Sequence, residues 1–445
     1  MTSGKRTRAG ITGWLDERLP IRNMLSTFLQ EPIPGGARWT YVFGSLCLVL
    51  FGVQLATGIV LGFFYAPSPD HALDSITYTY NEVPFGRVVL GIHHWSANIF
   101  IVMIGLHMLQ TFLWAAYKRP RELVWWSGVG LLLLVLGFHF TGFTLPWDQK
   151  GYWATEVGTS LVGTVPLVGD FAMKVLRGGS ELGAVTLTHF YAIHVLLLPA
   201  LVGGAVLLHL VFLRSVGPAG AWAPEQPAHE SSSFYPDQVF KDAIAIVLVL
   251  VLIVVLALFA YEPPTEPADS TDTTFLPRPE WNFLFLFQLL RYFKGSWEWV
   301  GTTILPVGLV LLLVLVPFLD RSKEQNPARR RVVVFSGLGM VAGILFLTAL
   351  AVVTAPPTAA RITDPTIRAG AKVFAANDCA SCHKVHGQGG ATGPDLSFAG
   401  SARETQWLKT YVRDPEKLNP ESTMPPFRLT EEELDRLAAY LKSLQ

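Results

Sequence analysis

Seven long apolar stretches constrain the fold of this 445-residue chain more than any other feature. A helix needs about 20 apolar residues to cross the hydrocarbon core of a bilayer, and each stretch is close to that length or longer. Charged residues make up only 15% of the chain, against about 25% in soluble domains. We therefore predict a mainly α fold built on a seven-helix transmembrane bundle. The predicted spans cover residues 39–65, 88–116, 123–145, 185–213, 243–261, 298–319 and 332–353.

The carboxy-terminal part of the chain has a different composition. Charged side chains are about twice as frequent over residues 361–445 as over residues 1–360. This change predicts a water-soluble domain over residues 365–445. Paired prolines make residues 356–364 the expected linker, because proline disfavours helix. Residues 1–36 are predicted to be a surface amphipathic helix or a loosely ordered tail.

The loops between the spans predict an orientation. Loops on the side of the amino terminus contain 16 basic residues, and loops on the other side contain 7. Because basic loops stay in the cytoplasm, we expect a cytoplasmic amino terminus and a carboxy-terminal domain at the outer, periplasmic side of a bacterial-type cell membrane. Lysine plus arginine equals aspartate plus glutamate, 34 of each. The basic excess typical of nucleic-acid binders is therefore absent.

The soluble domain contains a C-x-x-C-H motif, Cys379 to His383. This is the attachment signature of a c-type haem, with Cys379 and Cys382 as thioethers and His383 as the proximal iron ligand. A redox dithiol or half of a zinc site is the alternative, although a second cysteine pair is missing. Met424 is the only methionine of the domain and is the expected sixth ligand; His386 is a competitor close to His383. The pattern from 431 to 444 predicts the closing helix of an all-α cytochrome c domain.

Two of the predicted spans contain histidines at closely similar intervals. His93 and His107 stand at positions i and i+14, and His194 and His209 stand at i and i+15. In straight α-helices these offsets return to within about −40° and +60° of one face, with the members of a pair about 21 Å apart. Two neighbouring helices would thus present facing histidine pairs near each side of the membrane. Bis-histidine ligation of two non-covalent b haems is the expected use.

Other histidines and several glycines receive a less specific interpretation. His94 and His189 face other directions and are not expected to be ligands. A single membrane histidine usually hydrogen-bonds a neighbour, which is the interpretation of His71, His139 and His229. Four glycines repeat the i, i+14 interval and are expected to leave clearance for porphyrin edges, although ordinary helix packing is the alternative. These glycines are Gly44, Gly58, Gly128 and Gly142.

Several motifs in this order resemble cytochrome b of the quinol-oxidising bc and bf complexes. They include Gln54-Leu-Ala-Thr-Gly58, Lys118-Arg-Pro-Arg-Glu122, Pro146-Trp-Asp-Gln149, the four histidines and Pro279-Glu-Trp-Asn282. The i, i+15 interval of the fourth span is similar to the bf branch. The resemblance implies a four-helix di-haem domain over 37–215 and a three-helix domain, like subunit IV, over 216–355. A mono-haem cytochrome c is fused behind them.

The resemblance also implies how the histidines pair. His93 and His194 would bind the outer b haem, and His107 and His209 the inner one. Lys118 and Arg121 would meet the propionates of the inner haem or remain solvated surface charges. The bf branch attaches a further haem through a cysteine where this chain has Val42. Cys47, five residues later, is expected to be a buried structural thiol. Arg214 is a candidate for an inner quinone site.

The outer quinol site implied by the family consists of the motif at 279–282 and the loop at 144–160. Pro279, Glu280, Trp281 and Asn282 are the expected catalytic segment, with Glu280 accepting a quinol proton. Capping of the following helix is the alternative role for Glu280. Asn282 stands where the family usually has tyrosine, and His94 stands where the bf branch usually has arginine.

These implications make the chain a membrane electron-transfer subunit that oxidises quinol at the outer face. One electron would pass through a Rieske-type iron–sulfur protein to haem c and on to a soluble or membrane acceptor. The other would cross both b haems to a quinone, with proton translocation. The expected complex is homodimeric. Two alternatives are a di-haem anchor that links quinone to a dehydrogenase or reductase without bifurcation, and a transporter that would leave the haem motifs unexplained.

Overall fold

A computed structural model describes most of the chain outside its amino-terminal tail and several connections. The tail or surface helix predicted before residue 36 and the linker predicted at 356–364 lie almost wholly outside the described residues, as do His229 and His386. The described residues are 18, 29–30, 32–33, 36–219, 232–264, 267–269, 278–293, 295–354, 364–385, 388–390, 392–420 and 422–444.

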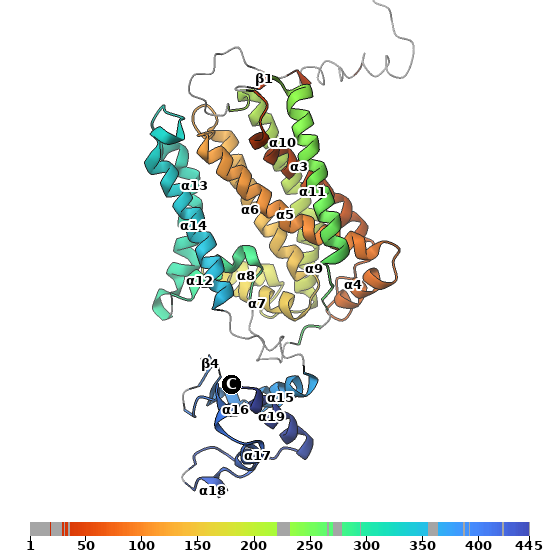
Figure 1. Ribbon diagram of the computed structural model, residues 1–445, viewed down its shortest axis with the longest axis vertical. Coiled ribbons are helices and arrows are strands. Elements are labelled where there is room, and N and C mark those ends of the chain that lie inside the picture. Colours follow the sequence, from red (N-terminus) through yellow and green to blue (C-terminus); the bar gives the residue numbers. More distant parts are fainter. Residues whose placement is uncertain are drawn as a thin grey trace, which may run out of the picture.

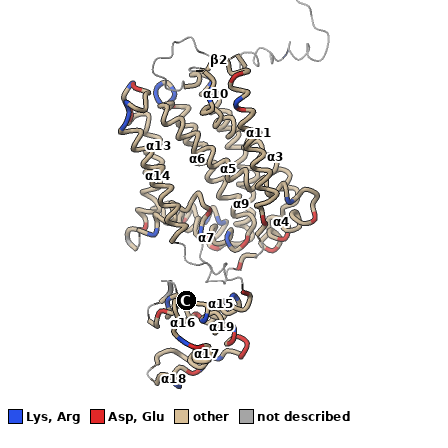
Figure 2. Tube along the Cα trace, in the orientation of Figure 1, with Lys and Arg blue, Asp and Glu red and all other residues tan. Residues whose placement is uncertain are grey.

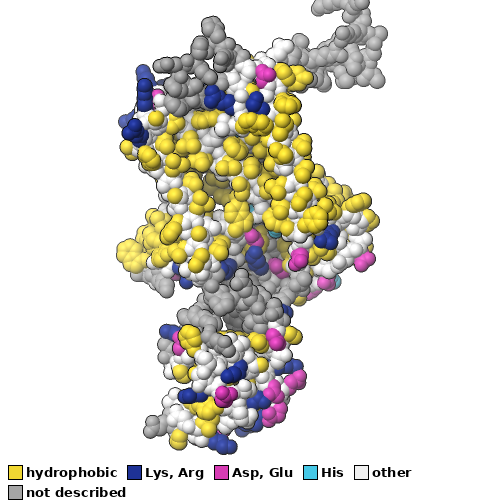
Figure 3. All heavy atoms as spheres, viewed as in Figure 1, with side chains coloured by type: hydrophobic (Ala, Val, Ile, Leu, Met, Phe, Trp, Pro, Cys, Tyr) yellow, Lys and Arg dark blue, Asp and Glu magenta, His cyan; other side chains and the backbone are white. Residues whose placement is uncertain are grey.

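Seven helices of the described chain are long and apolar enough to cross a membrane, which confirms the predicted number (Figure 1). Their outer surfaces are mainly apolar, and Figure 3 shows a broad hydrophobic band over the bundle on the face in view. Helices that are apolar all round are expected where lipid replaces water. The spans are Trp39–Gly62, Gly86–Leu113, Glu122–Thr144, Ala184–Val216, Phe234–Phe259, Val300–Leu319 and Arg331–Val353.

The first four spans pack together. They consist of η1 (Trp39–Tyr41) with α3 (Val42–Gly62), α5 (Gly86–Leu113), α6 (Glu122–Thr144), and a fourth span made of α9 (Ala184–Ala192), the π turn η2 (Ile193–Leu197) and α10 (Leu198–Val216). Helix α3 packs on α5, and α10 packs on α6. The core between them is aliphatic and aromatic. Its buried members are Leu50, Phe51, Phe100, Ile104, Val135, Val202 and Ile253.

The fifth span belongs with these four. It contains the π turn η3 (Phe234–Gln238) and α11 (Val239–Phe259), which packs on α5 and α3. At the crossing of α5 and α11, a Cβ on Gly91 would lie 2.8 Å from Ala257, so only glycine allows this approach. The sixth and seventh spans and the short helices next to them form a separate group in Figure 1. They are η4 (Trp281–Phe283), α12 (Leu284–Leu290), η5 (Gly295–Trp297), η6 (Val300–Ile304), α13 (Leu305–Leu319), η7 (Pro327–Arg329) and α14 (Arg331–Val353).

The two ends of the bundle differ. Short helices α4 (Ala72–Asn81), α7 (Gln149–Gly163) and α8 (Gly169–Arg177) lie at one end. Asp148 caps α7 by accepting a hydrogen bond from the Gly151 N–H at 2.7 Å. The other end carries the antiparallel pair β1 (Pro32–Ile33) and β2 (Ser232–Ser233). Figure 2 shows Lys and Arg at this second end, near α10 and the α13–α14 connection.

The carboxy-terminal domain is also helical, which confirms the predicted fold class. Helices α15 (Pro365–Ala376) and α19 (Glu431–Ser443) cross closely where Gly370 meets the backbone of Arg436. Thr430 and Glu433 form a capping box at the start of α19, the closing helix expected from the sequence. Between the two helices lie η9 (Cys379–Ser381), the strand pair β3 (Lys384–Val385) and β4 (Gln388–Gly389), α16 (Ala399–Ala402), α17 (Thr405–Arg413) and α18 (Pro415–Leu418).

Candidate functional site

The four spaced histidines lie in two pairs between α5 and the fourth span. His93 of α5 and His194 of η2 line one cavity of about 410 Å³. Further along the same helices, His107 and His209 lie close enough for their rings to interact electrostatically. His93 is therefore near His194, and His107 is near His209.

A π turn adjusts the phase of the fourth span. Pro199 has no N–H, and just before it the Leu198 N–H bonds to the carbonyl of Ile193, five residues back. A π turn adds a residue without the usual advance around the helix. In a straight α-helix the interval from His194 to His209 would leave an offset of about +60°. Because the π turn takes up one residue, His194 and His209 are related around the helix as two residues at i and i+14 would be. This is the interval between His93 and His107 on α5.

Hydroxyl groups from neighbouring helices orient three of the four rings. Thr57 Oγ1 lies 2.8 Å from His93 Nδ1, Thr141 Oγ1 3.0 Å from His194 Nδ1, and Ser127 Oγ 2.8 Å from His209 Nδ1. Each hydroxyl also donates to a backbone carbonyl of its own helix. It must therefore accept a hydrogen bond from the ring Nδ1–H. This selects the tautomer whose Nε2 carries a lone pair, as an iron ligand needs.

The four predicted glycines lie directly against the four histidines. An added Cβ would lie 3.5 Å from His107 at Gly44, 3.3 Å from His93 at Gly58, 3.5 Å from His209 at Gly128 and 2.5 Å from His194 at Gly142. Each ring therefore has one glycine beside its Cε1 atom. A side chain at any of these glycines would therefore press on a histidine ring, at both depths of the bundle.

In the soluble domain, His383 is held in a similar way. Its Nδ1 lies 2.9 Å from the Pro394 carbonyl and donates to it, which leaves Nε2 as the ring acceptor. A Cβ on Gly393 would lie 2.6 Å from the ring. Burial raises the pKa of the Cys379 thiol to about 11, because the thiolate would lose hydration. Met424 packs on the same apolar cluster as Cys379. In the described part of the chain, no three His, Cys, Asp or Glu side chains converge as ligands of a bare metal ion.

The two segments of the predicted outer site meet through an ion pair. The Lys150 ammonium at the start of α7 contacts the Glu280 carboxylate. The Trp281 indole donates to Asn98 Oδ1 on α5 at 2.6 Å, which ties the loop to the histidine helix. Glu280 lines the same cavity as His93. Both polar atoms of buried Asn282 have no hydrogen-bond partner within the described ranges. Pro279 lies just before Glu280, and it belongs to no helix or strand.

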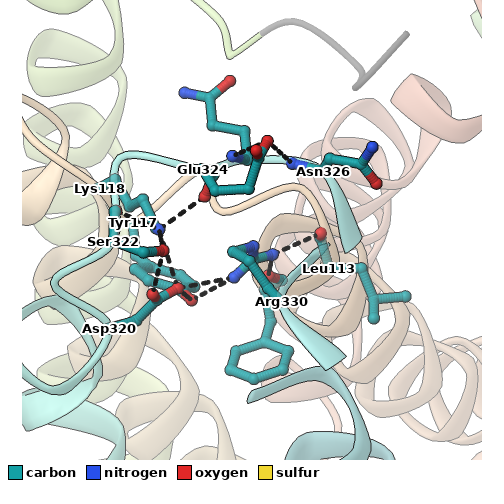
Figure 4. Close-up of polar contacts among 10 residues, drawn as sticks. Leu113, Tyr117, Lys118, Asp320, Ser322, Glu324, Asn326 and Arg330 are labelled. Carbon is teal, nitrogen blue, oxygen red and sulfur yellow. Dashed lines mark hydrogen bonds and ion pairs between the residues drawn. The ribbon is translucent and has the colours of Figure 1, made fainter. Parts of the chain in front are cut away.

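Lys118 has partners at the opposite end of the bundle (Figure 4). Its Nζ lies 3.0 Å from Asp320 Oδ2 and donates to the carbonyls of Ser322 and Glu324. An ammonium has three N–H groups, and these contacts use them. Arg121 donates to the Gly217 carbonyl at 3.2 Å. The expected contacts with haem propionates therefore stay predictions, and for Lys118 they would require exchange of its present partners.

Asp320 is the centre of a polar cluster with Tyr117, Lys118 and Arg330. Tyr117 OH and Arg330 Nη1 donate to its Oδ2 at 2.7 and 2.8 Å. Burial by itself would raise the pKa of Asp320, but hydrogen bonds from Tyr117, Arg330, Lys118 and Ser322 outweigh burial and lower that pKa to about 2. The cluster joins the α5–α6 connection to the α13–α14 connection, and so joins the two helix groups.

Comparisons with known proteins agree with this arrangement. The profile of cytochrome b/b6/petB matches residues 28–217, cytochrome b(C-terminal)/b6/petD matches 267–367, and cytochrome c matches 367–445. The cytochrome b subunit of a cytochrome bc complex from Chlorobaculum thiosulfatiphilum is 35% identical over 325 residues, 72% of this chain and 76% of that protein. This chain belongs to the cytochrome b family of bc complexes.

Two other members of the family illustrate the range of the match. Cytochrome b6 of Synechococcus sp. (strain CC9311) is 37% identical over 207 residues, 46% of this chain and 95% of that protein. A chain of a solved structure titled hyperthermophilic respiratory Complex III superposes with a TM-score of 0.70 at 30% identity. The match covers 82% of this chain and 95% of that one.

Sequence reasoning missed two features of this cytochrome b. Lys150 carries no motif signal, and only folding brings it to Glu280. Asp242 is buried in the first turn of α11, where it accepts hydrogen bonds of 2.7 Å from Ser45 and from Gln238. A single acid at the start of an apolar run resembles an ordinary helix-start residue. Its contact with Ser45, the residue after Gly44, becomes evident only when α3 and α11 pack.

The remaining predicted residues lie in the apolar core, at the cavity, beside a glycine or in the last turn of α10. Cys47 packs on the apolar core and Val42 is buried, so the thiol lies among aliphatic side chains. His94 lines the outer cavity and contacts Asn98 through its own backbone carbonyl at 2.9 Å. His189 lies beside Gly178. Arg214 is in the last turn of α10, on the side of the inner pair.

Proposed function

We propose that this chain is the cytochrome b and cytochrome c subunit of a quinol:cytochrome c-type oxidoreductase that couples electron transfer to proton translocation. One observation carries the proposal: Glu280 and the histidines His93 and His194 line the same cavity. Oxidation of a quinol releases protons and electrons together. The Glu280 carboxylate can accept a proton. The neighbouring pair of candidate haem ligands gives a position for the electron acceptor.

The residues present fit two b haems and one c haem. His93 with His194 and His107 with His209 would hold the b haems, and the hydroxyl contacts and adjacent glycines support this assignment. Cys379 and Cys382 would hold the c haem covalently. His383 and Met424 would be its axial ligands. When bound, these groups supply one-electron transfer at three separate points of the chain.

The protein residues of the outer site have distinct roles. Glu280 accepts a proton from a quinol hydroxyl. Lys150, in the first turn of α7, holds the Glu280 carboxylate in place through their ion pair. The hydrogen bond from Trp281 to Asn98 fixes the loop against α5, so that the carboxylate stays next to His93. Pro279 limits the backbone conformations of the preceding segment. Asn282 does not act as a proton donor in the way a tyrosine phenol could, because an amide does not release a proton at physiological pH.

Topology and domain division form part of the proposal. Lys and Arg gather at the end near α10, which supports a cytoplasmic position for that end and for the amino terminus. The cytochrome c domain then lies at the outer side, because α14 ends at the opposite surface. The di-haem domain spans 37–215, the subunit IV-like domain spans 216–355, and the cytochrome c domain spans 365–445. The family matches over 28–217, 267–367 and 367–445 support this order.

The proposed partners follow from the chemistry. A high-potential one-electron acceptor is required at the outer site, and a Rieske-type iron–sulfur protein is the family's partner. A soluble or membrane cytochrome or oxidase would take electrons from the fused domain, and a homodimer is expected. At the inner side, a quinone would receive the second electron, and Arg214 remains the candidate contact. The competing function is a di-haem anchor that passes both electrons along one route.

An oxidant pulse separates these two functions. The isolated complex is given decylubiquinol or menadiol and an inhibitor of the inner quinone site, and b-haem absorbance is followed while ferricyanide is added. If the two electrons of a quinol take different routes, removing electrons from the high-potential side increases b-haem reduction. A simple anchor would show b-haem oxidation instead. The same pulse on Glu280→Gln should give a much slower response, by about 10²-fold for loss of a general base.

A further inference from the structure

His139 has an unusual position on α6. The sequence predicts that it hydrogen-bonds a neighbour, as single membrane histidines usually do. In the structure its Nε2 atom is buried and has no hydrogen-bond partner among the described residues. A buried polar atom without a partner has lost its hydration and gained no hydrogen bond in return, which is unfavourable. The His139 ring lines a cavity, so a molecule bound in that cavity is a candidate for the missing partner.

The cavity that His139 lines is the outer one. The cavity wall also contains Glu280, Asn98 and His94, which come from the loop before η4 and from α5. The Glu280 carboxylate and the Lys150 ammonium are close enough to act electrostatically on the His139 ring. His139 thus lies in the polar part of the cavity, together with the residue to which we assign proton acceptance.

The haem-ligand pair is already complete without His139. His194 has Thr141 at its Nδ1 and Phe138 against its ring face, at 4.6 Å between ring centroids. Both belong to the same helix as His139. The side chains beside His139 on α6 therefore orient His194, whereas His139 lines the cavity and has a buried ring nitrogen without a partner in the described chain. A ligand that enters next to Glu280 is therefore a candidate partner for that nitrogen.

We propose that His139 Nε2 hydrogen-bonds a ring oxygen of the quinol whose proton Glu280 accepts. This deepens the proposed function and rests on it. An imidazole can accept a hydrogen bond from a quinol hydroxyl or, as the other tautomer, donate to a quinone carbonyl. Both redox forms of the substrate therefore have a partner at this atom. His139 is a substrate-contacting residue on α6, separate from the motif at 279–282 and from the haem ligands.

Three variants of the complete complex test the assignment. His139→Leu removes the ring nitrogen, His139→Gln keeps a hydrogen-bonding group, and His71→Leu makes the same chemical change at an exposed histidine outside the cavity. With decylubiquinol and with menadiol, His139→Leu should raise KM about 10-fold, equivalent to about 1.4 kcal/mol. His139→Gln should stay within about 3-fold of the unmodified complex, and His71→Leu should match it.

Other outcomes would overturn the assignment. An unchanged KM in His139→Leu would exclude the substrate contact, and so would an equal rise in the leucine and glutamine variants. A shift of the outer b-haem potential with unchanged KM would assign His139 to the haem. If His139→Leu does not accumulate, His139→Phe gives the same comparison with a ring in place. Glu280→Gln is measured in parallel. If it oxidises quinol at the unmodified rate, the proposed function fails, whereas a slow Glu280→Gln beside a normal His139→Leu rejects only the role of His139.

Discussion

The indole of Trp125 on α6 donates a 2.7 Å hydrogen bond to the backbone carbonyl of Leu313 on α13. Leu313 lies four residues before Pro317, which stands inside α13 and has no N–H to offer that carbonyl. The indole N–H on α6 thus replaces the backbone N–H that Pro317 cannot provide within α13. Trp126 makes a neighbouring bond of 2.9 Å to the Val314 carbonyl. These contacts hold α13 against α6 within the apolar layer.

Trp125→Phe should lower the stability of the assembled chain by about 1–2 kcal/mol, because the Leu313 carbonyl would be left without a donor in an apolar layer. In a Pro317→Ala background, residue 317 regains its N–H. The penalty of Trp125→Phe should then fall by more than half. The measurement is the temperature at which b-haem absorbance is lost in detergent, compared across the four chains of the double-mutant cycle.

Trp126→Phe is the matched control for that cycle. Val314 has its helical donor at Phe318 whether or not residue 317 is proline, so the Pro317→Ala change should leave the Trp126→Phe penalty unaltered. Equal penalties for Trp125→Phe in both backgrounds would mean that the indole contributes only packing.

Asp320→Asn should destabilise the bundle where the α5–α6 connection meets the α13–α14 connection. It leaves Lys118 and Arg330 as two buried cations without their shared carboxylate, and removing one partner of a buried ion pair costs about 3 kcal/mol or more. Adding Lys118→Met should recover part of that loss, because one uncompensated charge disappears. Thermal loss of the b-haem spectrum in the single and double variants measures both effects.

The pH dependence of that penalty has a defined sign. The pKa of Asp320 is lowered to about 2, below its ordinary value of about 3.9. Its stabilising contribution is therefore fully present above about pH 4 and is lost as the pH falls through about 2. The difference between the unmodified chain and Asp320→Asn should stay constant from about pH 5 to pH 8. A difference that decays within this range would show that Asp320 is partly protonated there.

The helical phase of the fourth span can be tested by deletion. Removing Leu197, which is 52% exposed, together with Pro199→Ala should convert η2 to regular α-helix with an i, i+14 interval. Both b haems should be retained, in a b-to-c ratio of about two from pyridine haemochrome spectra. Removing Val102, which is 43% exposed on the uninterrupted α-helix α5, rotates His93 against His107 by about 100° and should lose at least one b haem.

The two deletions are matched in size and in exposure to the lipid side. Loss of b haem in both would mean that the span tolerates no shortening and that the π turn has no compensating role. Retention in both would remove the phase argument and with it the pairing of the four histidines as axial ligands.

The number of spans, the soluble domain and its closing helix were predictable from the sequence because each depends on local composition or periodicity. Apolar length decides whether a segment can cross a bilayer, and C-x-x-C-H is contiguous. The intervals between His93 and His107 and between His194 and His209 also required only helical geometry. The fourth span still differs from the prediction, because the π turn before Pro199 makes its i, i+15 interval correspond to the i, i+14 interval on α5.

Only the tertiary structure could decide which distant side chains share an environment. The contact of Lys150 with Glu280 spans 130 residues of sequence, and that of Lys118 with Asp320 joins two connections on different helix groups. The hydroxyls at the histidine Nδ1 atoms and the unpartnered Nε2 of His139 are likewise consequences of packing. Hydropathy and spacing contain no record of such contacts, since they arise when separate helices meet. The sequence by itself therefore determined the number of membrane spans and the residue types of the candidate haem sites, and the packing of the helices decided their partners.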